Sequence, residues 1–284
     1  MITGKAGKEM PGRLYVVGTP IGNLGDLSPR AAETLEKADF IAAEDTRVTL
    51  KLLNYLGLKK ELLSYYEHNK NGRGNLIIER LKKGESCALV SDAGMPAISD
   101  PGEQLVCEAR EAGIAVEAVP GPSALVTALA VSGMPAGRFC FEGFLSVNKI
   151  SRREHLASLV NERRTMIFYE APHKLNSTLR DMLKAFGNRR LTVARELTKL
   201  HETVMNTTLK DAAEYFEINA PRGEFVLIIE GKQDEEKTYT EDDAVLLAKG
   251  LIAGGASTSS AAKEAAEVTG IKKGDIYRRI IGEA

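Results

Sequence analysis

Two carboxylates, Asp92 and Asp100, lie in the stretch 89–102 (LVSDAGMPAISDPG), whose prolines and glycines favour a stiff loop. The stretch contains no lysine or arginine. Acidic side chains and backbone dipoles without a basic residue suit a neutral or cationic ligand better than a phosphate. The phosphate-binding pattern GxxxxGK[ST] is absent from the chain, and Gly18, Gly22 and Gly25 do not fit the dinucleotide-binding pattern GxGxxG.

Polar residues also follow two other predicted strands. Asp45 and Arg47 come after the apolar run 40–43, and His68 and Asn69 come after the run 62–65. Carboxyl ends of strands face the crevice of an open α/β sheet, so these side chains are candidates for a site. Taken one at a time, they have simpler explanations. Asp100 alone is better explained as a helix N-cap, and His68 is equally compatible with a surface position and with a substrate contact.

The elements around the first loop are a strand, a rigid turn and a helix. Residues 87–90 (CALV) form a short buried strand, and 103–112 form a helix that Gly113 closes. Similar units recur at 120–123 (PGPS) and 170–173 (EAPH). We predict further strands at 14–18, 40–43, 62–65, 116–119, 139–145, 166–169, 191–194, 204–208 and 225–230, and further helices at 29–37, 48–56, 74–82, 124–131, 173–186 and 209–216.

This alternation predicts an α/β fold, with a mixed sheet in the second half of the chain. We place a flexible tail at 1–12, an N-terminal α/β domain at 13–137, a C-terminal α/β domain at 138–233 and a small helix-turn-helix-like domain at 240–284. The basic segment 149–164, and Lys272, Lys273, Arg278 and Arg279 in the last helix, are candidate RNA contacts. For the last helix, a solvated basic face is an equally good explanation.

Composition narrows the class of protein. The chain has 284 residues and a net charge of -1, so any nucleic-acid contact must depend on local patches. No apolar run approaches the length of a membrane span, and the first residues lack the apolar core of a signal peptide. The three cysteines lie in apolar segments without metal-ligand spacing, so we expect neither a disulfide nor a metal. These features favour a cytoplasmic protein.

Several ordered motifs together resemble one family. They are LYVVGTPIGNLGD at 14–26, ADFIAAEDTRVT at 38–49, EHN at 67–69, VSDAGMPAISDPG at 90–102, VPGPS at 119–123 and FEGFL at 141–145, with FYEAPHKL at 168–175 and ARELTKLHE at 194–202 in the second half. The chain resembles the ribosomal small-subunit methyltransferase I family of the tetrapyrrole-methylase superfamily, the class III S-adenosylmethionine-dependent methyltransferases. Met95 departs from the family, which usually carries threonine there.

The resemblance implies two α/β domains of the tetrapyrrole-methylase type with S-adenosyl-L-methionine in the cleft between them. It also implies a homodimer and methyl transfer to the ribose 2′-hydroxyl of a decoding-centre cytidine in the 16S rRNA of the small ribosomal subunit. The cofactor contacts that carry over onto this sequence are Ser91, Asp92, Ala93, Gly94, Met95, Ile98, Pro120, Gly121, Pro122, Ser123, Ala124, Tyr169, Glu170, Glu196 and Leu197. We assign RNA contacts to Pro20, Asn23, His68, Asn69, Lys149, Arg152 and Arg153.

Methylation of a hydroxyl needs alignment of the oxygen with the methyl group and a group that accepts the proton. We hypothesise that Asp45 acts as base or orienting group and that Arg47 clamps the substrate; His68 and Glu170 are the other candidate bases. Two alternatives stay open, namely a small-molecule methylase of tetrapyrroles and an RNA-binding factor without enzymatic activity. The first would have no use for the basic segments, and the second would have no use for three stiff loops at strand ends.

Overall fold

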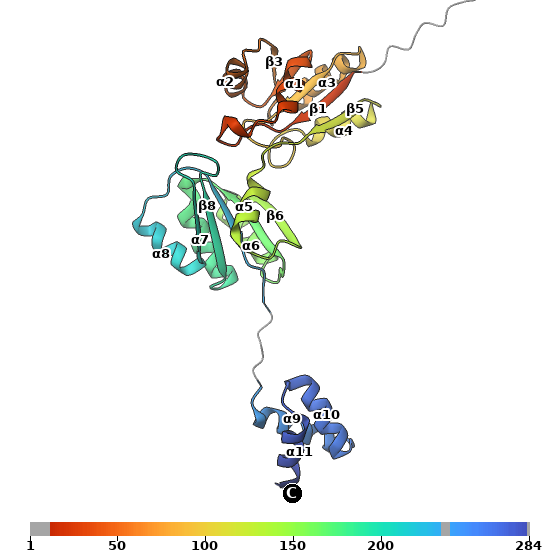
Figure 1. The fold of residues 1–284 in the computed structure, drawn as a ribbon, viewed down its shortest axis with the longest axis vertical. Helices are drawn as coiled ribbons and strands as arrows, with labels where there is room; N and C mark the ends of the chain where they lie inside the picture. The colour runs from red at the N-terminus through yellow and green to blue at the C-terminus, as the bar shows by residue number, and fades with distance from the viewer. Residues whose placement is uncertain (1–11, 234–238, 283–284) are drawn as a thin grey trace, which may run out of the picture. The chain divides into compact units, whose positions relative to one another are not determined.

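The computed structural model describes residues 12–233 and 239–282, which form two compact units divided at Lys232 and Gln233. The first unit carries two five-stranded sheets, and the second consists of helices (Figure 1). Except for Gly12, the predicted N-terminal tail lies outside the described residues. No helix in the described ranges is long and apolar enough to cross a membrane.

The first sheet is entirely parallel, in the order β3-β2-β4-β1-β5. Its central strands β2 and β4 are short apolar runs buried on both sides, as expected when helices cover both faces, whereas the edge strands β3 and β5 are partly exposed. Side chains of α3 and α4 pack on one face and those of α1 and α2 on the other. The elements are β1 (Arg13–Val17), η1 (Leu24–Asp26), α1 (Pro29–Lys37), β2 (Phe40–Ala43), α2 (Thr46–Leu56), β3 (Glu61–Ser64), α3 (Lys70–Lys82), β4 (Cys87–Val90), α4 (Glu103–Glu111) and β5 (Ala115–Val119).

The second sheet is mixed, in the order β6-β7-β10-β8-β9, with only the β6–β7 pair parallel. The mixed sheet predicted for this half is therefore confirmed. Helices α6, α7 and α8 pack on one face, and α5 packs on the other together with Ile21 from the first half of the chain. The elements are α5 (Ala124–Ser132), β6 (Phe139–Phe144), α6 (Lys149–Ser158), β7 (Thr165–Glu170), α7 (Pro172–Phe186), β8 (Arg190–Arg195), β9 (Thr203–Thr208), α8 (Leu209–Ile218) and β10 (Phe225–Ile229).

Local signals explain where helices begin. Ser28 caps α1 by accepting a hydrogen bond from the Ala31 amide at 3.0 Å, and Pro29 occupies the first helical position, as predicted. Helix α6 was not predicted, because its charged residues were interpreted only as candidate RNA contacts. The Asn148 side chain accepts hydrogen bonds from the Ile150 and Ser151 amides at the start of this helix, which is an ordinary N-cap signal.

The second unit is a small bundle with its own alanine-rich core. Its first helix begins with a capping box in which Thr240 and Asp243 exchange hydrogen bonds. In the last helix, Arg279 pairs with Asp242 and Glu241, and Arg278 pairs with Asp275. Carboxylates thus neutralise part of the basic face predicted for this helix. The helices are α9 (Glu241–Ala253), α10 (Thr258–Thr269) and α11 (Lys273–Gly282).

Candidate functional site

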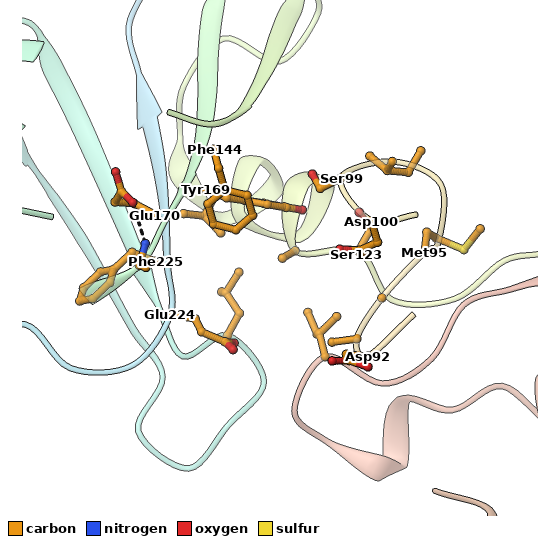
Figure 2. Close-up of a pocket in the computed structure, with 18 of the residues that line it drawn as sticks. Asp92, Met95, Ser99, Asp100, Ser123, Phe144, Tyr169, Glu170, Glu224 and Phe225 are labelled. Atoms are coloured by element: carbon orange, nitrogen blue, oxygen red, sulfur yellow. Dashed lines mark hydrogen bonds between the residues drawn. The ribbon is translucent and has the colours of Figure 1, made fainter. Parts of the chain in front are cut away.

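A cavity of about 520 Å³ lies between the strand-end loops of the first sheet and the second sheet. This volume is typical of small-molecule sites. Figure 2 shows Asp92, Met95, Ser99 and Asp100 on a loop across from Tyr169, with Glu224 on the same side as Phe225. The residues that line the cavity are Ile21, Glu44, Asp92, Ala93, Gly94, Met95, Ile98, Ser99, Asp100, Ser123, Ala124, Phe144, Tyr169, Glu170, Ala171, Pro172, Ala194, Leu197, Glu224, Phe225 and Val226.

Sheet topology explains why the cavity forms here. Strands β1 and β4 are neighbours, but the loop after β1 leads to α1 on one face of the sheet, whereas the loop after β4 leads to α4 on the other face. Their loops therefore diverge, and such a switch point is where open α/β sheets bind ligands. An isolated bridge ties the two loops together, with the Thr19 amide donating to the Gly94 carbonyl at 2.9 Å and the Gly94 amide donating to the Thr19 carbonyl at 3.1 Å.

Two glycines let the loop after β5 come close to the loop after β1. A Cβ atom on Gly18 would lie 2.7 Å from the Gly121 Cα, and a Cβ on Gly121 would lie 2.7 Å from the Gly18 carbonyl oxygen. Both clashes are with backbone atoms, which cannot move aside as a flexible side chain can. Gly121 and its neighbours Pro120 and Pro122 thus position the loop that presents Ser123 and Ala124 to the cavity.

Three carboxylates of the first sheet give the cavity its electrostatic character. Burial raises the pKa of Glu44, and nearby Asp100 and Asp92 raise it further. Burial is also the main cause of the raised pKa values of Asp92 and Asp100. None of the described residues that line the cavity is a lysine or arginine. The wall therefore favours a ligand with a positive charge and provides no basic side chain for a phosphate.

Aromatic side chains of the second sheet form the opposite wall. The Tyr169 ring packs edge-on against Phe141 and Phe144, with ring centroids 4.9 and 5.5 Å apart. Its hydroxyl oxygen accepts a hydrogen bond from the Leu125 amide at 2.9 Å, which fixes the ring beside the start of α5. This wall suits the flat face of a heteroaromatic ring.

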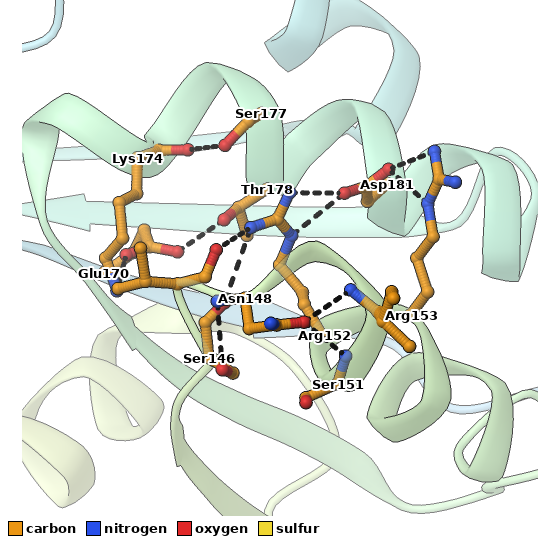
Figure 3. A network of polar contacts seen from close by, with 12 residues as sticks. Ser146, Asn148, Ser151, Arg152, Arg153, Glu170, Lys174, Ser177, Thr178 and Asp181 are labelled. Carbon is orange, nitrogen blue, oxygen red and sulfur yellow. Dashed lines mark hydrogen bonds and ion pairs between the residues drawn. The ribbon is translucent and has the colours of Figure 1, made fainter.

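Glu170 lines the cavity, but its carboxylate is engaged in the protein. One oxygen accepts a hydrogen bond from the Ala171 amide at 2.8 Å and pairs with Lys174 at 3.0 Å; the other accepts from the Thr178 hydroxyl at 2.5 Å. Lys174 also donates to the Leu145 carbonyl (Figure 3). A buried carboxylate whose two oxygens are both engaged is a poor base, so this residue holds the turn between β7 and α7.

The candidate catalytic pair lies outside the cavity lining. Asp45 is the N-cap of α2 and accepts from the Arg47 amide at 2.8 Å, while the Arg47 guanidinium pairs with the same carboxylate. These contacts lower the Asp45 pKa to about 2. The Arg47 side chain is 86% exposed. The pair stabilises the start of the helix, and the role of Asp45 as base or orienting group stays a prediction.

The structure brings ten of the predicted cofactor contacts into the lining of one cavity. They are Asp92, Ala93, Gly94, Met95, Ile98, Ser123, Ala124, Tyr169, Glu170 and Leu197. Ser91 is buried behind the loop, and its hydroxyl donates to the Ala93 carbonyl. Glu196 turns away to Lys199 and to the Glu224 amide. Pro120, Gly121 and Pro122 lie behind the wall rather than in it.

Of the predicted RNA contacts, Arg152 is the clearest correction. It is 7% exposed, and its guanidinium is bonded to Asp181 at 2.7 and 2.9 Å and to two backbone carbonyls (Figure 3). Lys149 and Arg153 on the same helix stay exposed. A long basic side chain at the start of a helix can face inward or outward, and the local sequence does not distinguish the two.

The other predicted RNA contacts lie in surface loops of the first sheet. Asn23 caps η1 through the Gly25 amide, and Asn69 bonds to the Tyr66 amide and the Ser64 carbonyl. His68 is exposed, and its ring packs edge-on to Tyr66. Pro20 is half-buried beside the bridge at Thr19.

Sequence reasoning missed Glu44 as an acid of the cavity, and it gave a helix cap as the simpler explanation of Asp100. Glu44 directly follows β2, but the sequence analysis assigned the site role at this strand end to Asp45 and Arg47. Asp100 does not cap α4, because Gly102 is the N-cap and makes no side-chain bond; Asp100 instead lines the cavity. The signal for both was their place directly after an apolar strand or beside a proline-bearing turn. Among the described residues, no group of three or more His, Cys, Asp or Glu could hold a metal ion.

Comparisons with known proteins give the family. The model of the tetrapyrrole (corrin/porphyrin) methylases matches residues 13–213. A ribosomal RNA small subunit methyltransferase I from Synechocystis is 47% identical over 269 residues, covering 94% of this chain and 96% of the relative. The protein of the same name from Xylella fastidiosa is 48% identical over 270 residues, covering 94% of this chain and 98% of the relative.

Solved structures agree on the fold. The uroporphyrin-III-C-methyltransferase of Thermus thermophilus matches with a TM-score of 0.56 and 21% identity, covering 77% of this chain and 94% of that one. A diphthine synthase matches with a TM-score of 0.60 and 14% identity, covering 78% of this chain and 91% of that one. With its two α/β sheets and its cavity at the switch point, the chain belongs to the tetrapyrrole methylase family and, within it, to the ribosomal RNA small subunit methyltransferase I group.

Proposed function

We propose that this protein transfers the methyl group of S-adenosyl-L-methionine to the ribose 2′-hydroxyl of a cytidine in the 16S rRNA of the small ribosomal subunit. The observation that supports this most is the cavity at the switch point, which joins a carboxylate-lined loop to an aromatic wall without a basic side chain. The names of the two relatives, both ribosomal RNA small subunit methyltransferases, support the substrate class.

The lining fits the cofactor by its chemistry. When bound, S-adenosylmethionine supplies an electrophilic methyl group on a positively charged sulfur. The carboxylates of Asp92 and Asp100 and the backbone of 93–95 and 123–124 would hold its polar part. Tyr169 and Phe144 would contact its adenine. Carboxylates without an adjacent lysine or arginine attract the positively charged sulfur of the cofactor. A phosphate-binding loop, which carries a basic side chain, would repel it.

The chain's part in the reaction is to orient the acceptor and to exclude water. A hydroxyl oxygen must approach the methyl group in line with the departing sulfur, and holding both groups in place accounts for much of the rate in such transfers. The stiff loops at 18–22, 92–102 and 120–123 provide that rigidity. Lys149 and Arg153 are exposed cations that we assign to the RNA backbone.

We also propose, as the family resemblance implies, that the protein acts as a homodimer in the cytoplasm. The cytidine belongs to the decoding centre in this proposal. The domain boundaries predicted above, at 13–137, 138–233 and 240–284, are part of the same proposal.

The experiment is mass mapping of ribose methylation in 16S rRNA from cells with and without the gene for this protein. We expect one cytidine to lose its 2′-O-methyl group when the protein is absent and to regain it on complementation. Purified protein with labelled cofactor should label 30S subunits and leave a precorrin unlabelled. An unchanged methylation map would reject the proposal, and label in the precorrin alone would favour a tetrapyrrole substrate.

A further inference from the structure

A second cavity, of about 810 Å³, adjoins the first. Glu44, Ser99 and Asp100 belong to the walls of both. These three residues therefore stand where a molecule in one cavity would meet a molecule in the other. The second cavity is lined by Glu44, Tyr66, Glu67, Ser99, Asp100, Pro101, Gly102, Glu103, Gln104 and Cys107.

The second cavity is the side from which an acceptor nucleoside can reach the methyl donor. Tyr66 is an exposed aromatic ring on its wall, and aromatic rings stack on bases of single-stranded RNA. Carboxylates accept hydrogen bonds from hydroxyl groups and from the exocyclic amine of cytosine. A nucleoside bound in this cavity would have its hydroxyl group beside the shared residues.

We propose that Glu44 is the catalytic residue that accepts the proton from the acceptor hydroxyl; this inference rests on the proposed function. Glu44 directly follows β2 and is half-buried at the junction of the two cavities. Its carboxylate accepts a hydrogen bond from the Asp92 amide at 3.4 Å, which is long. No lysine or arginine of the described ranges forms an ion pair with it. It therefore keeps lone pairs for a substrate hydrogen.

The neighbouring acids are less suited to this role. Asp92 accepts a hydrogen bond from the Asp45 amide at 3.0 Å, which is shorter than the 3.4 Å contact of Glu44, and a contact with Ser91 opposes the effect of burial on the pKa of Asp100. Asp45 is held by Arg47, and Glu170 is held by Lys174. The pKa of Glu44 is raised by burial and by its acidic neighbours, which makes its carboxylate a better proton acceptor than an exposed glutamate.

The step balances without another reactant. The hydroxyl oxygen forms a bond to the methyl carbon as the carbon–sulfur bond breaks, and sulfur keeps that electron pair and becomes a neutral thioether. The hydroxyl proton passes to the Glu44 carboxylate. The positive charge lost by sulfur is matched by the proton that Glu44 gains, and solvent later removes that proton.

The titration of Glu44 depends on the groups around it. On its own segment the neighbour is Asp45, with Arg47 next to it, and Asp92 and Asp100 face it from the loop after β4. The groups that face it across the second cavity are Tyr66, Glu67, Glu103 and Cys107.

The test is Glu44→Gln, which keeps the size of the side chain and removes its basicity. We expect kcat on 30S subunits to fall roughly 100-fold or more, while the calorimetric Kd for S-adenosylmethionine stays within about threefold of wild type. In the pH–rate profile, the wild-type rate should fall as pH drops through the Glu44 pKa. The Glu44→Gln variant should lack this acidic limb of the profile. The matched control is Glu61→Gln at the opposite end of the neighbouring strand β3, which should behave as wild type.

A second measurement does not need activity. In a carbon NMR titration of the protein labelled at its glutamate carboxyls, the Glu44 signal, assigned from its loss in Glu44→Gln, should titrate above that of Glu61, whose pKa Arg80 lowers. Glu44→Asp, which keeps a carboxylate, should retain the acidic limb at a reduced rate, and it replaces Glu44→Gln for the rate assay if that variant unfolds.

Each outcome has a definite consequence. A Glu44→Gln rate near wild type, or a loss of cofactor binding as large as the loss of rate, would overturn the inference while leaving the proposed function intact. A Glu44 signal that titrates at or below that of Glu61 would overturn it too. Wild-type protein that binds the cofactor and methylates no ribose of 30S subunits would overturn the proposed function and this inference together.

Discussion

Glu44, Asp92 and Asp100 follow β2 and β4 and line the cavity, and no lysine or arginine of the described residues forms an ion pair with them, whereas at the end of β7 Glu170 is bonded to Lys174 and Thr178. One end of the cavity therefore keeps its negative charge available to a ligand, and the other end uses a carboxylate to hold its own turn. A carboxylate can therefore bind a ligand at one end of the cavity and stabilise the fold at the other. The difference is whether a cationic side chain of the protein pairs with it.

The largest expected effect on stability comes from removing the partner of Glu170 at the end of β7. Lys174→Met would leave the Glu170 side chain, which is 1% exposed, without its ammonium partner. Removing one partner of a buried pair typically costs about 3–5 kcal/mol, so we expect a loss of this size in the free energy of unfolding in urea. Lys210→Met is the control, because the Lys210–Glu214 pair is exposed. A Lys174→Met variant as stable as the control would show that Glu170 does not need this partner.

The next effect concerns the close packing of the loop after β5 on the loop after β1. Gly121→Ala would place a methyl group 2.7 Å from the Gly18 carbonyl oxygen. We expect a loss of about 1–3 kcal/mol in stability. The shifted loop should also weaken S-adenosylmethionine binding, measured by calorimetry, at least tenfold. Gly137→Ala meets no atom within 4 Å and serves as control. Unchanged affinity in Gly121→Ala would separate this loop from the site.

Sequence patterns predicted much of this arrangement. The strand, loop and helix around 87–112 are confirmed, as is the closing glycine at 113, because each depends on local residues. The strand order β3-β2-β4-β1-β5 was not predicted, because pairing depends on contacts between distant segments. Helix α3 begins at Lys70, four residues before the predicted start at Gly74.

The limits of prediction at the site have the same cause. The partners of Glu170 and the inward turn of Arg152 arise from packing, so the sequence alone could not separate binding acids from structural ones. Among the acids after β2, the residue type gave no reason to prefer Glu44 over Asp45. The capping contact of Asp45 and the cavity beside Glu44 make that distinction. The assignments of the predicted site residues to cofactor and RNA stay predictions.

A smaller effect on stability is expected for the exposed cations of α6, Lys149 and Arg153, than for the buried Arg152. Replacing Lys149 and Arg153 with alanine should change stability by less than about 0.5 kcal/mol, because both side chains are exposed and the Arg153–Asp181 contact of 3.4 Å is long, while Asp181 keeps its bonds to Arg152. If both contact phosphates, the salt dependence of binding to 30S subunits should flatten by about one unit of slope for each. Lys82→Ala on α3 is the control. An unchanged slope would remove these residues from the RNA surface.

The last expected effect concerns the pH dependence of stability that arises from Asp100. Because the folded-state pKa of Asp100 is raised, the folded protein binds more protons than the unfolded chain between the ordinary and the raised pKa, and stability falls as pH rises through that window. Asp100→Asn should therefore stabilise the protein at neutral pH, by less than about 1 kcal/mol because the side chain is half-buried. The gain should vanish below the ordinary aspartate pKa. A variant that is less stable at neutral pH would contradict the sign.

The most direct measurement is a crystal structure of the protein soaked with S-adenosylmethionine. We expect the sulfur and the amino group beside the loop 92–100 and the adenine against Tyr169, with the methyl group directed toward Glu44. Density for the cofactor at any other place, with this cavity left vacant, would contradict the central claim that carboxylates without cationic partners form the binding end of the site.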